Sequence, residues 1–183
     1  MRGTEGRRIG RRDNPLRPVV WGGAALLLLL PAVAMRLHAG GVAWGAADFA
    51  VFGAMLAIAC GLYELAARTS GDAWYRAGAG IAVATGFLTV WANLAVGMIG
   101  GEGNPFNLLF AGVLAVAAIG ASLAKLRAAG MVRAMLATAV AQALAVAVAL
   151  ALDGGHDLRG GIFSALFVAP WLLSSALFRR ASH

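Results

Sequence analysis

The feature that most constrains this chain is a series of six apolar runs, separated by short polar or glycine-rich segments. Because an α-helix rises 1.5 Å per residue, a run of about 20 residues crosses the roughly 30 Å hydrocarbon core of a bilayer. The pattern therefore predicts six transmembrane helices. The runs occupy residues 19–37, 44–67, 77–99, 106–126, 131–152 and 161–178.

The composition favours a membrane over water as the solvent of this fold. With 61% hydrophobic and 13% charged residues, the chain has too little polar surface to cover a water-soluble globule. Unbroken apolar runs indicate helices, since a membrane β-barrel would show short alternating segments. We expect an all-α membrane protein: one six-helix transmembrane bundle with short loops over residues 19–180, preceded by a basic cytoplasmic N-terminal tail at residues 1–18.

Lysine and arginine gather on one side of the predicted bundle. If the N-terminus lies inside, thirteen of them fall in inner segments and only Arg36 and Arg159 in outer ones. Positive charge beside a spanning helix is retained on the cytoplasmic side, so both termini are predicted to be cytoplasmic. The thirteen are Arg2, Arg7, Arg8, Arg11, Arg12, Arg17, Arg68, Arg76, Lys125, Arg127, Arg133, Arg179 and Arg180.

The net charge of +7 does not indicate a nucleic-acid-binding protein. The arginines flank helix ends in ones and twos, so the expected partners are the anionic headgroups of membrane lipids at the cytoplasmic face. Arginine greatly outnumbers the single lysine, Lys125, which indicates a GC-rich bacterial gene. We therefore expect a multi-pass protein of the bacterial cytoplasmic (inner) membrane.

The first apolar run has an alternative interpretation. The basic residues before it, the apolar stretch 21–30, Pro31 and the small residues 32–34 resemble a cleavable signal peptide, which would leave five helices. Apolar character continues to Leu37, so the run is long enough to span the bilayer. We expect it to be an uncleaved anchor.

Residues that bind cofactors are sparse. Cys60 is the only cysteine, which excludes an intrachain disulfide and a CxxC pair. His38, His156 and His183 lie in loops or the tail, which argues against a haem held by paired histidines. The loop at residues 153–159 offers oxygen and imidazole ligands but fits no established metal-binding spacing. We predict no cofactor and no metal site, and no catalytic constellation points to an enzyme.

Polar residues inside the third span recur every four positions. Thr85, Thr89 and Asn93 therefore share one helix face, which we expect to point into the bundle because an amide facing hydrocarbon would leave its hydrogen-bonding groups unmet. One interpretation is packing, in which the hydroxyls bond their own helix and Asn93 bonds a neighbour. The other is a polar stripe that descends from the outer surface, with Gln142 of the fifth span continuing it.

Several further polar residues belong to the outer half of the predicted bundle and form a candidate outer-facing polar pocket. Asp48, one turn into the second span, is interpreted first as an acid stabilised by its helix N-terminus, with a functional carboxylate as the alternative. Asn104 before Pro105 is typical of a helix N-cap. The candidate pocket comprises Asp48, Thr85, Thr89, Asn93, Glu102, Asn104, Asn107 and Gln142.

Two further patterns favour packing over chemistry. Glu64 precedes Arg68 by one helical turn, which predicts an ion pair between them. Gly53 and Gly61 of the second span, and Gly112 and Gly120 of the fourth, permit close approach of neighbouring helices.

Four stretches of the chain resemble uncharacterised multi-pass proteobacterial membrane proteins. They read WGAADF at 44–49, GLYEL at 61–65, WANLAVGMIG at 91–100 and NPFN at 104–107. The likeness covers roughly the second to fifth spans. It implies a membrane location and carries no activity.

These observations favour an accessory or interaction protein of a membrane assembly, which packs against a membrane-protein partner or a second copy of itself. The small-residue faces and the lack of a catalytic constellation support this prediction. The alternative is a small transporter or channel that uses an outer-facing pocket containing Asp48 and Asn93, although the charged mid-membrane residues of ion-coupled carriers are missing from the sequence.

The distribution of basic residues yields a test of orientation. Reporter fusions after residues 72, 128 and 183 are expected to behave as cytoplasmic, and fusions near residues 40, 103 and 156 as external. The measurement is the activity of paired reporters that work on opposite sides of the membrane. A C-terminal fusion active on the external side would contradict the six-helix topology.

Overall fold

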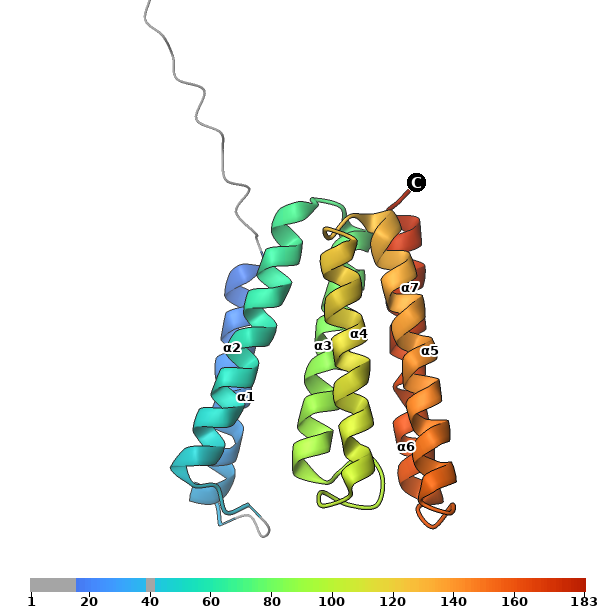
Figure 1. Ribbon diagram of the computed structural model, residues 1–183. Coiled ribbons are helices and arrows are strands. Elements are labelled where there is room, and N and C mark those ends of the chain that lie inside the picture. Colours follow the sequence, from blue (N-terminus) through green and yellow to red (C-terminus); the bar gives the residue numbers. More distant parts are fainter. Residues whose placement is uncertain (1–15, 39–41) are drawn as a thin grey trace, which may run out of the picture.

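The computed structural model describes residues 16–38 and 42–183, and these form helices joined by short loops (Figure 1). Six helical segments are long and apolar enough to cross a membrane, the last of them formed by two consecutive helices. The all-α, six-helix fold class is therefore confirmed. The helices are α1 Arg17–Arg36, α2 Ala46–Thr69, α3 Ala73–Ala95, α4 Leu108–Leu123, α5 Ala128–Leu152, α6 Leu158–Leu166 and α7 Val168–Arg180, with a 3-10 turn η1 at Pro105–Asn107.

The helices alternate in direction, so the start of α1 and the C-terminus lie at the same end of the molecule, at the top of Figure 1. We call this the basic end, because it holds eight of the ten lysines and arginines within the described residues; Arg36 and Arg159 lie at the opposite end. Residues 1–15, which make up most of the predicted tail, and residues 39–41 lie outside the described residues.

Several helix boundaries differ from those predicted, those of α3 by the most. The third span was placed at 77–99, but α3 begins at Ala73, where Asp72 accepts a hydrogen bond from the Tyr75 amide at 2.8 Å, and ends at Ala95. Residues 96–104 instead form a loop. The fourth span was extended to 126, but α4 ends at Leu123.

The last span is divided into two helices near Pro170. Helix α6 ends at Leu166 and α7 begins at Val168. Pro170 has no N–H to donate to the carbonyl four residues earlier, that of Leu166, so the helical ladder is interrupted there. The two helices still run consecutively and together make one candidate span, Leu158–Arg180.

The core of the bundle lies among α3, α4, α5 and α7. Near the basic end, Tyr75, Met135, Trp171 and Phe178 are buried in one cluster. Near the opposite end a second cluster surrounds Phe110. Many apolar side chains outside these two clusters remain exposed, and in a bilayer they face lipid.

Small residues bring particular helices into close contact. A Cβ added at Gly120 of α4 would lie 2.9 Å from the Cβ of Ala134 in α5, so glycine is required for this approach. The Ser174 hydroxyl of α7 donates to the Gly78 carbonyl of α3 at 2.8 Å. The close approach expected of Gly120 is thus confirmed, whereas Gly61 and Gly112 have no neighbour within 4 Å in the direction of an added Cβ.

Helices α1 and α2 form a hairpin at the edge of this core. An aromatic cluster of Trp44, Phe52, Phe87 and Trp91 joins α2 to α3, with the Phe52 and Trp91 ring centroids 4.5 Å apart. Helix α1 lies beside α2 and contributes no buried residue. The hairpin is therefore the peripheral part of the described fold (Figure 1).

Candidate functional site

The loop between α3 and η1 is the centre of a hydrogen-bonded network at the opposite end. Asn107 Oδ1 accepts from the backbone amides of Met98 and Ile99, each at 3.0 Å, and Asn107 Nδ2 donates to the Gly101 carbonyl at 2.7 Å. One side chain thereby satisfies three backbone groups of a loop whose Met98 and Ile99 are fully buried. We call this set of contacts, with its extensions described below, the end network.

Three glycines allow the loop to take this shape. Gly97, Gly100 and Gly101 have positive φ values of +74°, +68° and +85°, which L side chains rarely adopt. A Cβ at Gly97 would also lie 2.3 Å from the carbonyl carbon of Gly101. The glycine-rich segment is therefore a structural requirement of the loop.

The end network reaches three further helices. Asn93 of α3 donates through Nδ2 to the Asn107 carbonyl at 3.3 Å. The Ser164 hydroxyl of α6 donates to the Met98 carbonyl at 2.7 Å, and Gln142 of α5 donates to the Ser164 carbonyl at 2.9 Å. These bonds bring together residues far apart in the sequence.

The loop between α5 and α6 completes the network through two aspartates. Asp157 Oδ2 accepts from the Gly100 amide at 2.7 Å, while its Oδ1 accepts from the Gly160 amide at 2.9 Å and so caps α6. Asp153 accepts from Asn104 Nδ2 at 3.5 Å and from the Asp157 amide at 3.1 Å. The loop at residues 96–104 and the loop between α5 and α6 are thereby joined.

Of the eight predicted pocket residues, the structure brings four into this network: Asn93, Asn104, Asn107 and Gln142. The end network is completed by Ser164, Asp153 and Asp157, none of which was predicted to belong to the pocket. The two aspartates had been considered only as metal ligands. No group of three or more His, Cys, Asp or Glu side chains that could hold a metal ion occurs among the described residues.

Three of the other four predicted residues, Thr85, Thr89 and Asp48, have local roles. Thr85 and Thr89 are buried and donate to carbonyls of their own helix, those of Ile81 and Thr85. The expected inward orientation of this face is confirmed. Asp48 is exposed, and its Oδ2 accepts from the Gly45 amide at 2.7 Å, which is the capping role expected of an acid in the first helical turn.

Glu102 lies in an exposed turn, and no side-chain contact is found for it within the described residues. On α3, Phe87 and Trp91 belong to the aromatic cluster and are half-buried against α2. The structure therefore does not assemble the eight residues into one pocket.

Three buried polar atoms have no hydrogen-bond partner within the described residues: Asn93 Oδ1, Gln142 Oε1 and Trp171 Nε1. Two are acceptors and one is a donor, and they belong to α3, α5 and α7. Buried polar groups are normally paired, so each of these three atoms has the capacity for at least one further hydrogen bond.

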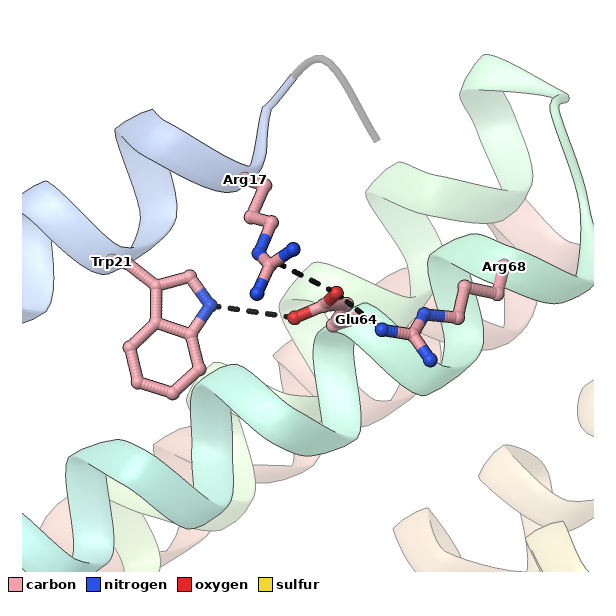
Figure 2. Close-up of polar contacts among 4 residues, drawn as sticks. All are labelled: Arg17, Trp21, Glu64 and Arg68. Carbon is pink, nitrogen blue, oxygen red and sulfur yellow. Dashed lines mark hydrogen bonds and ion pairs between the residues drawn. The ribbon is translucent and has the colours of Figure 1, made fainter. Parts of the chain in front are cut away.

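At the basic end, Glu64 joins α1 to α2 (Figure 2). Its carboxylate accepts from Arg68 at 2.6 Å, which confirms the predicted ion pair within α2. It also lies 3.6 Å from the Arg17 guanidinium and accepts from Trp21 Nε1 at 3.4 Å, both from α1. We call these four residues the Glu64 clamp.

Comparison with known proteins adds no relative: no family model matches the chain, and neither a curated protein nor a solved structure does. The class of the protein follows from its fold alone. It is a multi-pass α-helical membrane protein. The resemblance to proteobacterial membrane proteins stays a prediction.

The Asp157 contacts predict a pH-dependent stability. A hydrogen bond from the Gly100 amide is the main cause that lowers the pKa of Asp157 in the folded chain, and a hydrogen bond from the Gly160 amide lowers it further. The stabilisation is therefore present above the ordinary carboxyl pKa of about 3.9 and is lost as the pH falls through the lowered value. Asp157→Asn, which gives up one charge-assisted bond, is expected to cost about 1 kcal/mol at pH 7 and much less at an acidic pH below that lowered pKa.

Thermal unfolding in a mild detergent at the two pH values measures this difference. The control is Glu102→Gln, which removes a carboxylate in the neighbouring exposed loop and is expected to leave the unfolding temperature unchanged. An Asp157→Asn effect of equal size at both pH values would show that the carboxylate charge has no part in it.

Proposed function

We propose that this chain is an accessory or interaction protein of a membrane assembly in the bacterial inner membrane, and that its α1–α2 hairpin is the part presented to a partner. The observation that carries the proposal is that α1 is twenty residues long and buries none of them. Every other candidate span contributes buried residues to the fold.

The attachment of α1 supports this role. The Glu64 clamp fixes the basic end of α1 to α2 through Arg17 and Trp21. Farther along, Leu28 of α1 lies against Gly53 of α2, whose added Cβ would be 3.7 Å from the leucine side chain. A helix held in place in this way, with Leu29, Leu30 and Val33 all more than half exposed, offers an apolar surface to a second membrane protein or a second copy.

The polar residues of the predicted pocket also favour an interaction protein. Thr85, Thr89, Asn93 and Gln142 donate to backbone carbonyls, and the loops that would cover an outer opening are bonded to one another. The bonds of Asn93 and Gln142 join different elements, as interhelical bonds do in a bilayer, whereas those of Thr85 and Thr89 stay within α3.

Transport is the second candidate, and one observation favours it. The unpaired atoms of Asn93, Gln142 and Trp171 could bond a polar solute or water inside the bundle. Cysteine placed at Thr89 distinguishes the two candidates: reaction with a water-soluble thiol reagent from outside would support an aqueous path, and protection would support packing.

Site-specific photocrosslinking in native membranes tests the interaction proposal. A photoreactive residue is placed at Leu30 of α1 and, as matched control, at Ile119 of α4; both side chains are 59% exposed. We expect the Leu30 probe to give a protein adduct of one reproducible mass and the Ile119 probe to give lipid adducts alone. A further probe at Leu29 covers the adjoining face of α1.

The mass of the adduct identifies the kind of partner. Twice the mass of this chain would indicate a second copy, and any other discrete mass a different membrane protein. Lipid adducts alone at all three positions would contradict the proposal.

A further inference from the structure

A lateral cleft of about 770 Å³ lies between α2, α3 and α4, away from the Glu64 clamp and the end network. Its lining is almost entirely apolar, and Met135 and Trp171 of the core contribute to it. Within this lining, Lys125 carries the only charge and Ser122 the only hydroxyl. An apolar cleft with one cation is suited to an amphiphile with an anionic group.

The cleft has the length of one leaflet. Its lining extends from Met55 to Ala66 on α2 and from Ala79 to Val90 on α3, which at 1.5 Å per residue is about 16 Å on each helix. This is close to half of the roughly 30 Å hydrocarbon core. Towards the opposite end the lining stops at Phe87 and Val90, where the aromatic cluster closes α2 against α3.

This length selects among possible occupants. A transmembrane helix of a partner crosses both leaflets, so it would extend well beyond the aromatic cluster. The acyl chains of one lipid occupy a single leaflet and fit the observed extent. The leaflet is the one at the basic end, where Lys125 lies.

Lys125 is placed to meet a headgroup. Its side chain is exposed and makes no hydrogen bond or ion pair within the described residues. By contrast, Arg68 is paired with Glu64, and Arg76 donates to the carbonyls of Ser70 and Ala67. Lys125 is therefore a free cation at the mouth of an apolar cleft, where its charge complements an anion.

The turn that carries Lys125 is held in an unusual backbone conformation. Lys125 and Leu126 have φ values of 50° and 55°, in the left-handed region that non-glycine residues seldom adopt. A chain of hydrogen bonds fixes the turn: Thr69 donates to the Tyr75 hydroxyl at 2.9 Å, and Tyr75 donates to the Leu126 carbonyl at 2.6 Å. The position of Lys125 is thus coupled to the loop between α2 and α3.

We propose that this cleft binds one anionic phospholipid from the leaflet at the basic end, with its acyl chains against α2, α3 and α4 and its phosphate on Lys125. The site is separate from the exposed face of α1 that the partner is proposed to contact, because the cleft is lined from α2 and contains no residue of α1. Loss of the protein partner and loss of the lipid are therefore distinguishable results.

Native mass spectrometry of the full chain tests the site. The protein is purified in mild detergent and equilibrated with mixed micelles of phosphatidylglycerol or phosphatidylcholine, which share their acyl chains and differ in net charge. We expect one phosphatidylglycerol to be retained per chain, with a preference of about fivefold over phosphatidylcholine, as is typical of one lysine near an anionic surface.

Two variants assign the preference to Lys125. Lys125→Gln is expected to abolish it, whereas Arg127→Gln, which removes a charge two residues away that does not line the cleft, is expected to preserve it. Ala118→Phe, which places a ring in the cleft, is expected to reduce retention of both lipids. Since Lys125→Gln removes no contact of the described fold, the test does not depend on whether Ala118→Phe folds.

Three results would overturn the proposal. They are equal retention of the two lipids by the unaltered chain, equal loss of preference in Lys125→Gln and Arg127→Gln, and the absence of any retained lipid. The second would show that the basic end binds anionic lipid without using the cleft.

Discussion

The structure depends on one constraint, which is that a backbone amide or carbonyl removed from water must find a partner within the protein. Helices satisfy it along their length, but the loop at residues 96–104, in which Met98 and Ile99 are buried, cannot. Asn107 meets the need by bonding the amides of Met98 and Ile99 and the carbonyl of Gly101. Around it, Asn93, Ser164 and Asp157 bond further backbone groups of the same loop and its neighbours.

The two ends of the bundle use polar residues differently. At the opposite end, amides, a hydroxyl and the carboxylates of Asp153 and Asp157 bond mainly backbone groups and hold the loops over the core. At the basic end, charged side chains dominate, and Glu64 joins a peripheral helix to the fold. Between them lies an apolar middle in which α2 stands apart from α4, leaving a cleft open to lipid. The proposed contacts with a partner and with a phospholipid use these features and leave the end network intact.

The sequence predicted what local periodicity determines. The six spans, the inward face of Thr85 and Thr89, and the pairing of Glu64 with Arg68 all follow from spacing along a helix. It could not predict the bonds of Asp157 to Gly100 or Ser164 to Met98, because these join residues 57 and 66 positions apart and depend on how helices pack. For the same reason, eight outer-half polar residues were grouped into one pocket, although Asp48 and Glu102 lie outside the end network.

The central claim is that polar side chains at the opposite end satisfy the hydrogen-bonding groups of the backbone. Hydrogen exchange at the amides of Met98 and Ile99 tests this claim most directly. Asn107→Ala is expected to speed exchange at both amides and to lower stability by about 1 to 3 kcal/mol, the cost of unsatisfied buried groups. Asn107→Asp retains the acceptor and is expected to restore part of the protection. Unchanged exchange at Met98 and Ile99 in Asn107→Ala would contradict the account.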